Sequence, residues 1–262
     1  MKKLFYRACI ELTNQRLLSR ILRAFSRSKI SRRLIPSFVK TYQLNEEEMG
    51  RPVSEYSHLH DLFIRTLKPG ARPIDLDARS VISPVDGAVA QVGQLEEKTC
   101  FYVKGQKYNI VEMLGSQEAA GRYRDGMYII LYLSPKDYHR IHSPVDGVVR
   151  KQWSLGGRSY PVNEAGLRYG RRPLSRNYRM ITELQVADKQ LAIVKVGAMN
   201  INTIEWTHQS TEIKKGEEIA YFSFGSTVVL LAEKGLLVPD SVADIGSIQM
   251  GARLAMKEEK ER

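Results

Sequence analysis

The spacing of hydrophobic positions in the first 40 residues predicts helices. Hydrophobic side chains recur there at steps of three and four, and basic side chains follow the same steps. The hydrophobic set includes Leu18, Ile21, Leu22 and Phe25, and the basic set is Arg16, Arg20, Arg23 and Arg27. This spacing places a hydrophobic stripe and a cationic stripe on different sides of a helix. Pro36 interrupts the pattern, and residues 35–39 form a further short hydrophobic piece.

From residue 81 onward the pattern changes to short runs rich in β-branched and aromatic residues, separated by turns. These runs are too short for typical helices and predict strands. They cover residues 88–92, 127–133, 147–151, 191–196, 219–224 and 227–231. Residues 59–67 predict a short helix that ends at Lys68-Pro69-Gly70, residues 165–176 predict a loop, and residues 256–262 predict a frayed tail.

The fold class expected from this order is α+β. N-terminal amphipathic helices precede a β-rich domain, and three consecutive acids at 46–48 mark the boundary. We therefore predict a basic helical segment at 1–45 and a β-rich domain at 46–262. The pentapeptide Ser-Pro-Val-Asp-Gly occurs at 83–87 and again at 143–147. Each copy has the residue types of a tight turn, so we expect a duplicated, barrel-like sandwich unless a common turn has recurred by chance.

The net charge of +11 is concentrated at the N-terminus. Residues 1–40 hold eleven Lys or Arg and one acid, a net charge of +10. Such a segment suits an anionic partner, either a membrane surface or a nucleic acid, although an amphipathic helix can also pack on its own protein's core. No run of about 18 hydrophobic residues is present, and the N-terminus is a poor signal peptide. We therefore expect a peripheral protein on the cytoplasmic side of the cell membrane.

Three places in the sequence could carry chemistry. Gly225-Ser226 interrupts two hydrophobic β-like runs, which suggests either a serine at a strained, exposed bond or a simple β-bulge. His139 and His142 precede the second pentapeptide and could move protons, or could pack and cap a loop. Asp86 lies in the first pentapeptide, and an Asp, a His and a Ser from different parts of a chain can assemble a nucleophilic triad, but many proteins contain these three residue types and the sequence alone does not bring them together. No His, Cys or acidic partner stands at a recognisable metal-site spacing, so we expect no metal.

Taken in order, the motifs of the chain resemble those of the phosphatidylserine decarboxylase family, in its short bacterial form. The matching segments are residues 63–74, 83–87, 133–144, 160–163, 196–200, 215–218 and 224–228. Two positions depart from the family pattern. Phe224 replaces the leucine that commonly precedes Gly-Ser-Thr, and Tyr178 replaces the glutamate of a common Asn-Glu-Arg motif, here Asn177-Tyr178-Arg179. No role of that glutamate can be transferred to Tyr178.

The resemblance implies a chain that cuts itself between Gly225 and Ser226. The hydroxyl of Ser226 would attack the Gly225 carbonyl, with His142 as the base and Asp86 orienting it. Elimination and loss of ammonia would leave a pyruvoyl group on residue 226, and two chains, β (1–225) and α (226–262), that stay together as a heterodimer. A higher oligomer is possible.

The resemblance also implies the reaction. The pyruvoyl group would form a Schiff base with the amine of phosphatidylserine and accept the electrons released by loss of CO2, which gives phosphatidylethanolamine. No metal would be required. His139 is the candidate for proton delivery or headgroup contact. The basic N-terminal segment would hold the enzyme on anionic, phosphatidylserine-containing membrane.

Two other classes of protein compete with this interpretation. A biotinyl or lipoyl carrier also uses repeated strand–turn units, but it needs a lysine at a hairpin tip, and no suitable turn is present. A nucleic-acid binder could use the basic segment, but that segment interleaves leucines rather than surface aromatics, and no known nucleic-acid motif occurs. We therefore expect no nucleic-acid partner.

Overall fold

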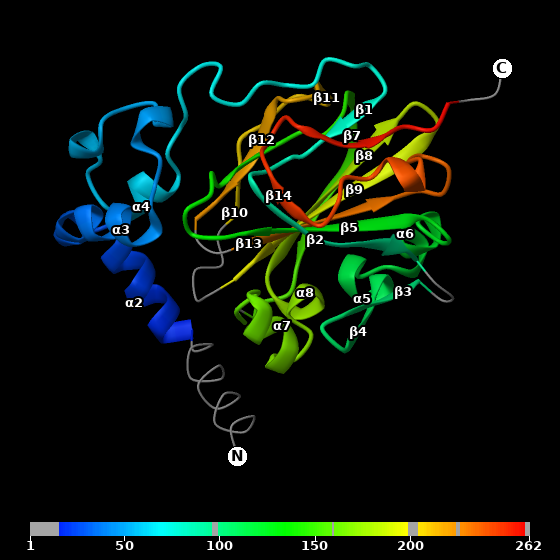
Figure 1. Cartoon of the computed structure of the whole chain (residues 1–262). Helices are drawn as coiled ribbons and strands as arrows, with labels where there is room; N and C mark the ends of the chain where they lie inside the picture. The colour runs from blue at the N-terminus through cyan, green and yellow to red at the C-terminus, as the bar shows by residue number, and fades with distance from the viewer. Residues whose placement is uncertain (1–15, 96–98, 159, 199–203, 224–225, 260–262) are drawn as a thin grey trace.

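The computed structural model describes residues 16–95, 99–158, 160–198, 204–223 and 226–259. The N-terminal part is helical and lies to one side of a β-rich body (Figure 1). It contains α2 (Arg16–Ser26), a 3-10 helix (Lys29–Leu34), α3 (Ile35–Tyr42), two 3-10 turns (Glu46–Glu48 and Val53–Glu55) and α4 (Leu59–Phe63). Pro36 is the second residue of α3, in the first turn, where its missing N–H costs nothing, so it is compatible with the start of this helix.

An eight-stranded sheet forms the centre of the body, and all its strand pairs are antiparallel. Its order is β11 (Glu212–Ile213), β7 (Gly147–Leu155), β8 (Arg179–Val186), β9 (Lys189–Gly197), β13 (Ser226–Ala232), β5 (Met127–Leu133), β2 (Gly87–Gln94) and β14 (Gly246–Ile248). Strand β13 therefore lies in the middle of the sheet, between β9 and β5.

Smaller elements complete the body. A three-stranded sheet joins β10 (Ile204–Trp206), β12 (Glu218–Phe222) and β6 (Arg140–His142), and two-stranded pairs join β1 (Ser80–Ile82) to β15 (Arg253–Met256) and β3 (Cys100–Val103) to β4 (Gln106–Asn109). The remaining helices are α5 (Ile110–Leu114), α6 (Gln117–Arg122), α7 (Glu164–Tyr169), α8 (Pro173–Arg176) and a 3-10 turn at Pro239–Ser241.

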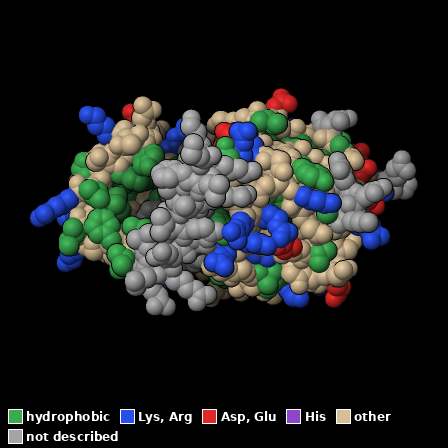
Figure 2. Space-filling model, turned by 90° about the horizontal axis from the view of Figure 1, so that it is seen from below, with side chains coloured by type: hydrophobic (Ala, Val, Ile, Leu, Met, Phe, Trp, Pro, Cys, Tyr) green, Lys and Arg blue, Asp and Glu red, His purple; other side chains and the backbone are tan. Residues whose placement is uncertain are grey.

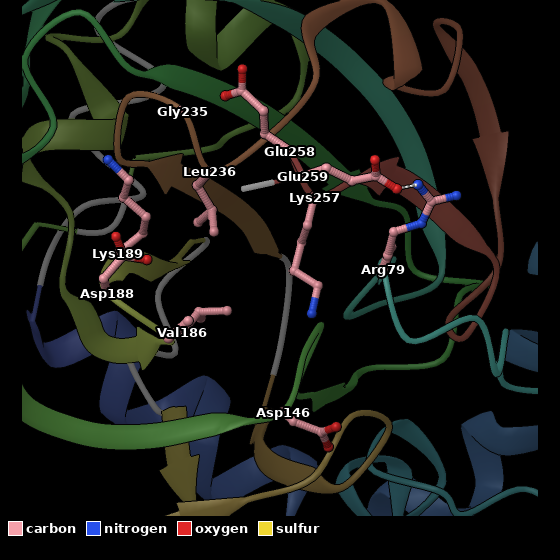
Figure 3. Close-up of a pocket in the computed structure, with 11 residues that line it drawn as sticks. Arg79, Asp146, Val186, Asp188, Lys189, Gly235, Leu236, Lys257, Glu258 and Glu259 are labelled. Atoms are coloured by element: carbon pink, nitrogen blue, oxygen red, sulfur yellow. Dashed lines mark hydrogen bonds and ion pairs between the residues drawn. The ribbon is translucent and has the colours of Figure 1, made fainter. Parts of the chain in front are cut away.

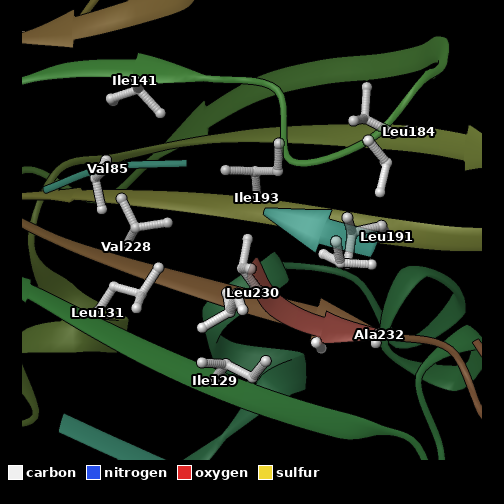
Figure 4. Packing of buried hydrophobic residues seen from close by; sticks show 14 of the residues in the cluster. Val85, Ile129, Leu131, Ile141, Leu184, Leu191, Ile193, Val228, Leu230 and Ala232 are labelled. Atoms are coloured by element: carbon white, nitrogen blue, oxygen red, sulfur yellow. The ribbon is translucent and has the colours of Figure 1, made fainter. Parts of the chain in front are cut away.

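Both faces of the central sheet are covered. Successive side chains of a strand point to opposite faces, so Val228 and Leu230 of β13 belong to one hydrophobic cluster and Val229 and Leu231 to another. Figure 4 shows the first cluster, in which side chains of β5, β9 and β13 meet. All seven residues of β13 are buried. Because β13 is buried on both faces, its sequence is a continuous hydrophobic run and does not alternate between hydrophobic and polar residues.

The two Ser-Pro-Val-Asp-Gly turns make matching hydrogen bonds. The N–H of Ile82 donates to the carbonyl of Pro144 (3.0 Å), and the N–H of His142 donates to the carbonyl of Pro84 (2.8 Å). Each serine hydroxyl donates to the valine carbonyl two residues later, at 2.7 Å in both turns. The two turns therefore lie side by side and are related by similar contacts. The duplicated barrel-like sandwich and the division at residue 45 stay predictions.

The mixed helix and sheet composition and all six predicted strands are confirmed, with ends shifted by up to four residues. The predicted helix at 59–67 is shorter, since α4 ends at Phe63. The predicted loop at 165–176 is wrong, because α7 and α8 occupy it. Asn163 caps α7 by accepting from Gly166 N, and Pro173 begins α8, so local capping outweighs the glycines and arginines that suggested a loop. The expected tail contributes Met256 to β15, and residues 260–262 lie outside the described part of the chain.

Candidate active site

Ser226 is the first residue of β13 and is fully buried. Its neighbours across the sheet are Leu133 on β5 and Gly197 on β9. Within the described residues, its hydroxyl oxygen makes no hydrogen bond. An unpaired buried hydroxyl is unfavourable, and such groups are uncommon in folded proteins, so one at this position suggests a chemical use. The preceding residues, Phe224 and Gly225, carry predicted roles but lie outside the described residues.

His142 is buried at the end of β6 and is held through both ring nitrogens. Its Nδ1 lies 2.8 Å from the carbonyl oxygen of Gly216, and its Nε2 lies 3.2 Å from the hydroxyl of Tyr138. A carbonyl oxygen can only accept, so Nδ1 carries the proton and the Nε2 lone pair accepts from Tyr138. Burial, followed by smaller effects, lowers the pKa of His142. His142 is therefore a neutral imidazole near pH 7, with a lone pair that can take a proton.

Asp86 is buried in the first of the two turns and is paired with Arg72. Arg72 donates from Nε and Nη2 to the carboxylate, with the shortest distance 2.6 Å, and also donates to Glu48 at 3.0 Å. The hydrogen bonds to Asp86 and Glu48 raise the pKa of Arg72. The backbone N–H of Met250 donates to Asp86 Oδ1 at 2.8 Å. This buried carboxylate is thus satisfied by one cation and one amide, as buried charges require.

The three residues of the expected triad share no hydrogen bond in the described structure. The carbonyl of Gly216, not Asp86, accepts from His142 Nδ1. The Asp86 charge is nevertheless among the groups that raise the pKa of His142. A pocket of about 220 Å³ is lined by Arg72, which binds Asp86, and by Tyr138, which contacts His142. The structure therefore brings Asp86 and His142 into one region, and their roles with Ser226 stay predictions.

His139 makes contacts with the segment before Ser226. Its backbone carbonyl accepts from the N–H of Phe222 at 2.9 Å, and its ring lies 3.9 Å from that of Phe63 on α4. Its Nδ1 lies 2.8 Å from the carbonyl of Asp137, so Nδ1 carries the proton, and its buried Nε2 has no hydrogen-bond partner among the residues that the structure describes. Complete burial lowers the pKa of His139 to about 3. His139 is therefore also neutral, and its free nitrogen can accept a proton.

Sequence reasoning missed the arginines that hold these groups. Arg65 is buried and donates through Nη2 to the carbonyls of Lys136 (2.7 Å) and Asp137 (3.1 Å), which fixes the segment leading to His139. Arg72 binds Asp86. Both arginines lie in the motif at 63–74. Their presence among hydrophobic and turn residues was the only sign in that motif that they could have a structural role. The partner of each one comes from a distant part of the chain and could not be read from spacing.

Other features of the structure lie apart from these residues. A pocket of about 950 Å³ is lined by residues of the β8–β9 turn, by residues after β13 and by residues 257–259 (Figure 3). It lies at the opposite end of β9 and β13 from Gly197 and Ser226, and none of the expected catalytic residues lines it.

No group of three or more His, Cys, Asp or Glu side chains in the described parts of the chain is placed to hold a metal ion.

Asp146 provides a matched control for the role of Asp86. It occupies the same place in the second turn, and its Oδ1 accepts from Lys215 N at 2.9 Å, but it is exposed. We expect Asp86→Asn to slow self-cleavage at least about tenfold, because the neutral amide no longer pairs with Arg72 or favours a protonated His142. Asp146→Asn should cleave at the wild-type rate. The measurement is the rate at which the full-length chain disappears on a denaturing gel, and equal rates for both variants would contradict the assignment.

Comparisons with known proteins agree with the motifs. The family model for phosphatidylserine decarboxylase matches residues 59–256. The phosphatidylserine decarboxylase proenzyme of Geobacillus sp. (strain WCH70) is 55% identical over 256 residues, which cover 97% of this chain and 98% of the relative. The proenzymes of Geobacillus kaustophilus and Halalkalibacterium halodurans are 53% and 50% identical, with 97% of this chain covered in each case and 97% and 98% of the relatives.

Proposed function

Because this chain belongs to the phosphatidylserine decarboxylase family, we propose that it converts phosphatidylserine to phosphatidylethanolamine and CO2 after cutting itself before Ser226. The observation that carries the self-cleavage is the buried, unpaired hydroxyl of Ser226 at the start of the central strand. The relatives are named proenzymes, which supports a chain that must be processed before it works.

In the proposed cleavage, the oxygen of Ser226 bonds to the carbonyl carbon of Gly225 while a base takes the hydroxyl proton. The amide C–N bond then breaks, its nitrogen takes a proton, and an ester joins the two residues. Removal of the α-proton of residue 226 expels the Gly225 carboxylate and leaves a dehydroalanine. Water then replaces the nitrogen, which leaves as ammonia, and residue 226 becomes a pyruvoyl group. The products are chains of residues 1–225 and 226–262.

The described residues fit the formation of such a group at position 226. His142 is neutral, and its Nε2 can take a proton, which suits the base of the cleavage step. The cross-strand neighbour Gly197 has no side chain to fill the space beside residue 226. When formed, the pyruvoyl group supplies a ketone that condenses with the substrate amine as a Schiff base and accepts the electrons of the broken C–C bond. We assign proton delivery or headgroup contact in the decarboxylation to His139, whose Nε2 has no hydrogen-bond partner in the described part of the chain.

The N-terminal helices supply the surface that we propose for membrane contact. Several hydrophobic side chains of α2 and the following 3-10 helix are exposed: Ile21, Leu22, Phe25, Ile30 and Leu34. Figure 2 shows hydrophobic side chains gathered on this part of the molecule, with Lys and Arg side chains projecting around them. Among the helices that the structure describes, none is long and apolar enough to span a bilayer. This combination suits a segment that lies in the headgroup region of an anionic membrane.

Ile30 tests the membrane surface, because its side chain is 67% exposed in the 3-10 helix. We expect Ile30→Glu to weaken binding to phosphatidylserine-containing vesicles by about tenfold, since a buried isoleucine contributes about 1.5–3 kcal/mol and an added acid is repelled. Ile245→Glu is the control, because Ile245 is 74% exposed in the segment before β14. Vesicle flotation measures both. Equal loss in the two variants would contradict a specific surface at the N-terminal helices.

Two measurements on the purified protein test the proposed function together. Mass spectrometry should find a chain of residues 1–225 and a second of 37 residues that begins with a pyruvoyl group instead of serine. The same preparation should release CO2 from phosphatidylserine labelled in the serine carboxyl, and a carbonyl-trapping reagent should stop this release. An intact Ser226 in a preparation that is fully active on the lipid would falsify the proposal.

A further inference from the structure

A buried serine–histidine pair lies close to the proposed cleavage bond, with its serine three residues before Ser226. Ser223 is fully buried, and its hydroxyl lies 3.2 Å from Nε2 of His60 on α4. His60 is itself 5% exposed. The pair joins parts of the chain that are 163 residues apart, and the mechanism above does not use it.

The proton on this histidine can be placed from its neighbours. Arg27 Nη2 lies 3.4 Å from the same Nε2, and a guanidinium group can only donate. Nε2 therefore presents its lone pair, and the Ser223 hydroxyl donates to it. Burial and then the Arg27 charge lower the pKa of His60 to about 4, so the ring is neutral near pH 7. The direction of the Ser223 hydroxyl is thus fixed by a histidine that stays an acceptor.

Helix α4 connects the N-terminal segment to the cleavage segment. On its N-terminal side, the hydroxyl of Ser31 accepts from Leu59 N (3.0 Å). The same hydroxyl lies 2.8 Å from the carbonyl of Ser28 and 3.0 Å from that of Ser26 at the end of α2, either of which can accept its proton. On its other side, His60 contacts Ser223, and the Phe63 ring contacts that of His139. The placement of residue 223 therefore depends on α4, which in turn is held against α2.

We propose that His60 is a positioning residue for self-cleavage, which holds Ser223 and thereby the backbone leading to the bond between residues 225 and 226. This inference rests on the proposed function. Attack by Ser226 on the preceding carbonyl requires close alignment of the reacting atoms, and displacements of about 1 Å can cost about 100-fold in rate. A hydrogen bond that fixes the chain three residues away restricts such displacements. His60 touches neither reacting atom and is therefore not a catalytic residue.

The test follows cleavage of the full-length chain made by cell-free translation without membranes. We expect His60→Ala and Ser223→Ala each to slow first-order conversion by about tenfold, and the double variant to be no slower than either one, because both remove the same contact. His60→Asn should recover most of the rate, since its amide oxygen can accept from Ser223. His208→Ala is the matched control, because His208 is also buried but its Nε2 contacts the carbonyl of Glu212 and not Ser223.

A second readout separates positioning from general damage to the fold. After cleavage, residue 223 no longer has a scissile bond to hold, so CO2 release per cut chain should equal that of the wild type in the His60 and Ser223 variants. Ser223→Ala removes a single oxygen, so it tests the contact even where His60→Ala does not fold. Wild-type cleavage rates in both single variants, or multiplied effects in the double variant, would overturn the inference. A wild-type chain that never converts would instead contradict the proposed function.

Discussion

Replacing Ser226 with alanine is expected to leave one uncut chain of 262 residues without decarboxylase activity. The substitution removes the oxygen that attacks the preceding carbonyl, and no other side chain can take its place at the same peptide bond. The loss should be complete, because the reaction also loses its electron acceptor, without which the carbanion has no stabilisation. A denaturing gel and the labelled-lipid assay measure the two losses separately.

Ser175 provides the control for this substitution. It is also buried, and its hydroxyl also lacks a hydrogen bond in the described part of the chain, but it lies in α8. Ser175→Ala should cleave and decarboxylate like the wild type. Cleavage of Ser226→Ala at the normal position would show that another group attacks, and the proposed mechanism would then be wrong.

The second large effect is expected at His142. His142→Ala should slow self-cleavage by about 100-fold or more, the usual contribution of a general base. The structure supports this role because the carbonyl of Gly216 keeps the imidazole proton on Nδ1. Nε2 is then left as the nitrogen that can accept a proton from Ser226. The measurement is again the conversion of the full-length chain over time.

Two other histidines make this experiment specific. His208 is buried and also contacts a backbone carbonyl, that of Glu212 at 3.0 Å, so His208→Ala reproduces the loss of a buried ring and should cleave normally. His139→Ala is the informative comparison, because the contacts of His139 reach Phe222. If His139→Ala abolished cleavage while His142→Ala cleaved normally, the base would be His139.

The sequence was most informative where local pattern and local structure agree. The six strands were predictable because β-branched residues and turns alternate, and β5 (Met127–Leu133) was placed with its observed ends. The Gly-Ser that interrupts a hydrophobic run points to position 226, but it suggests an exposed bond or a simple bulge, whereas Ser226 is fully buried. The helices at 164–176 were missed because their formation depends on capping by Asn163 and on Pro173, while their composition is that of a loop.

The remaining parts of the candidate site depend on contacts that are distant in sequence. The partner of Asp86 is Arg72, and that of His142 is the carbonyl of Gly216, which no side-chain pattern can reveal. His60 was visible only as one of two histidines in 58–60, and its contact with Ser223 arises from the packing of α4. Spacing can suggest which residue types could react, but the hydrogen bonds that fix their protons come from the fold.

The central position of β13 has a consequence for the lifetime of the enzyme. Its seven residues pair with β9 on one side and β5 on the other, and the strand is buried on both faces. A fragment starting at Ser226 would therefore be unable to leave without dismantling the middle of the sheet, and a fresh fragment could not enter. An enzyme molecule whose ketone has been chemically modified would therefore stay inactive. Activity would return only through synthesis of a new polypeptide.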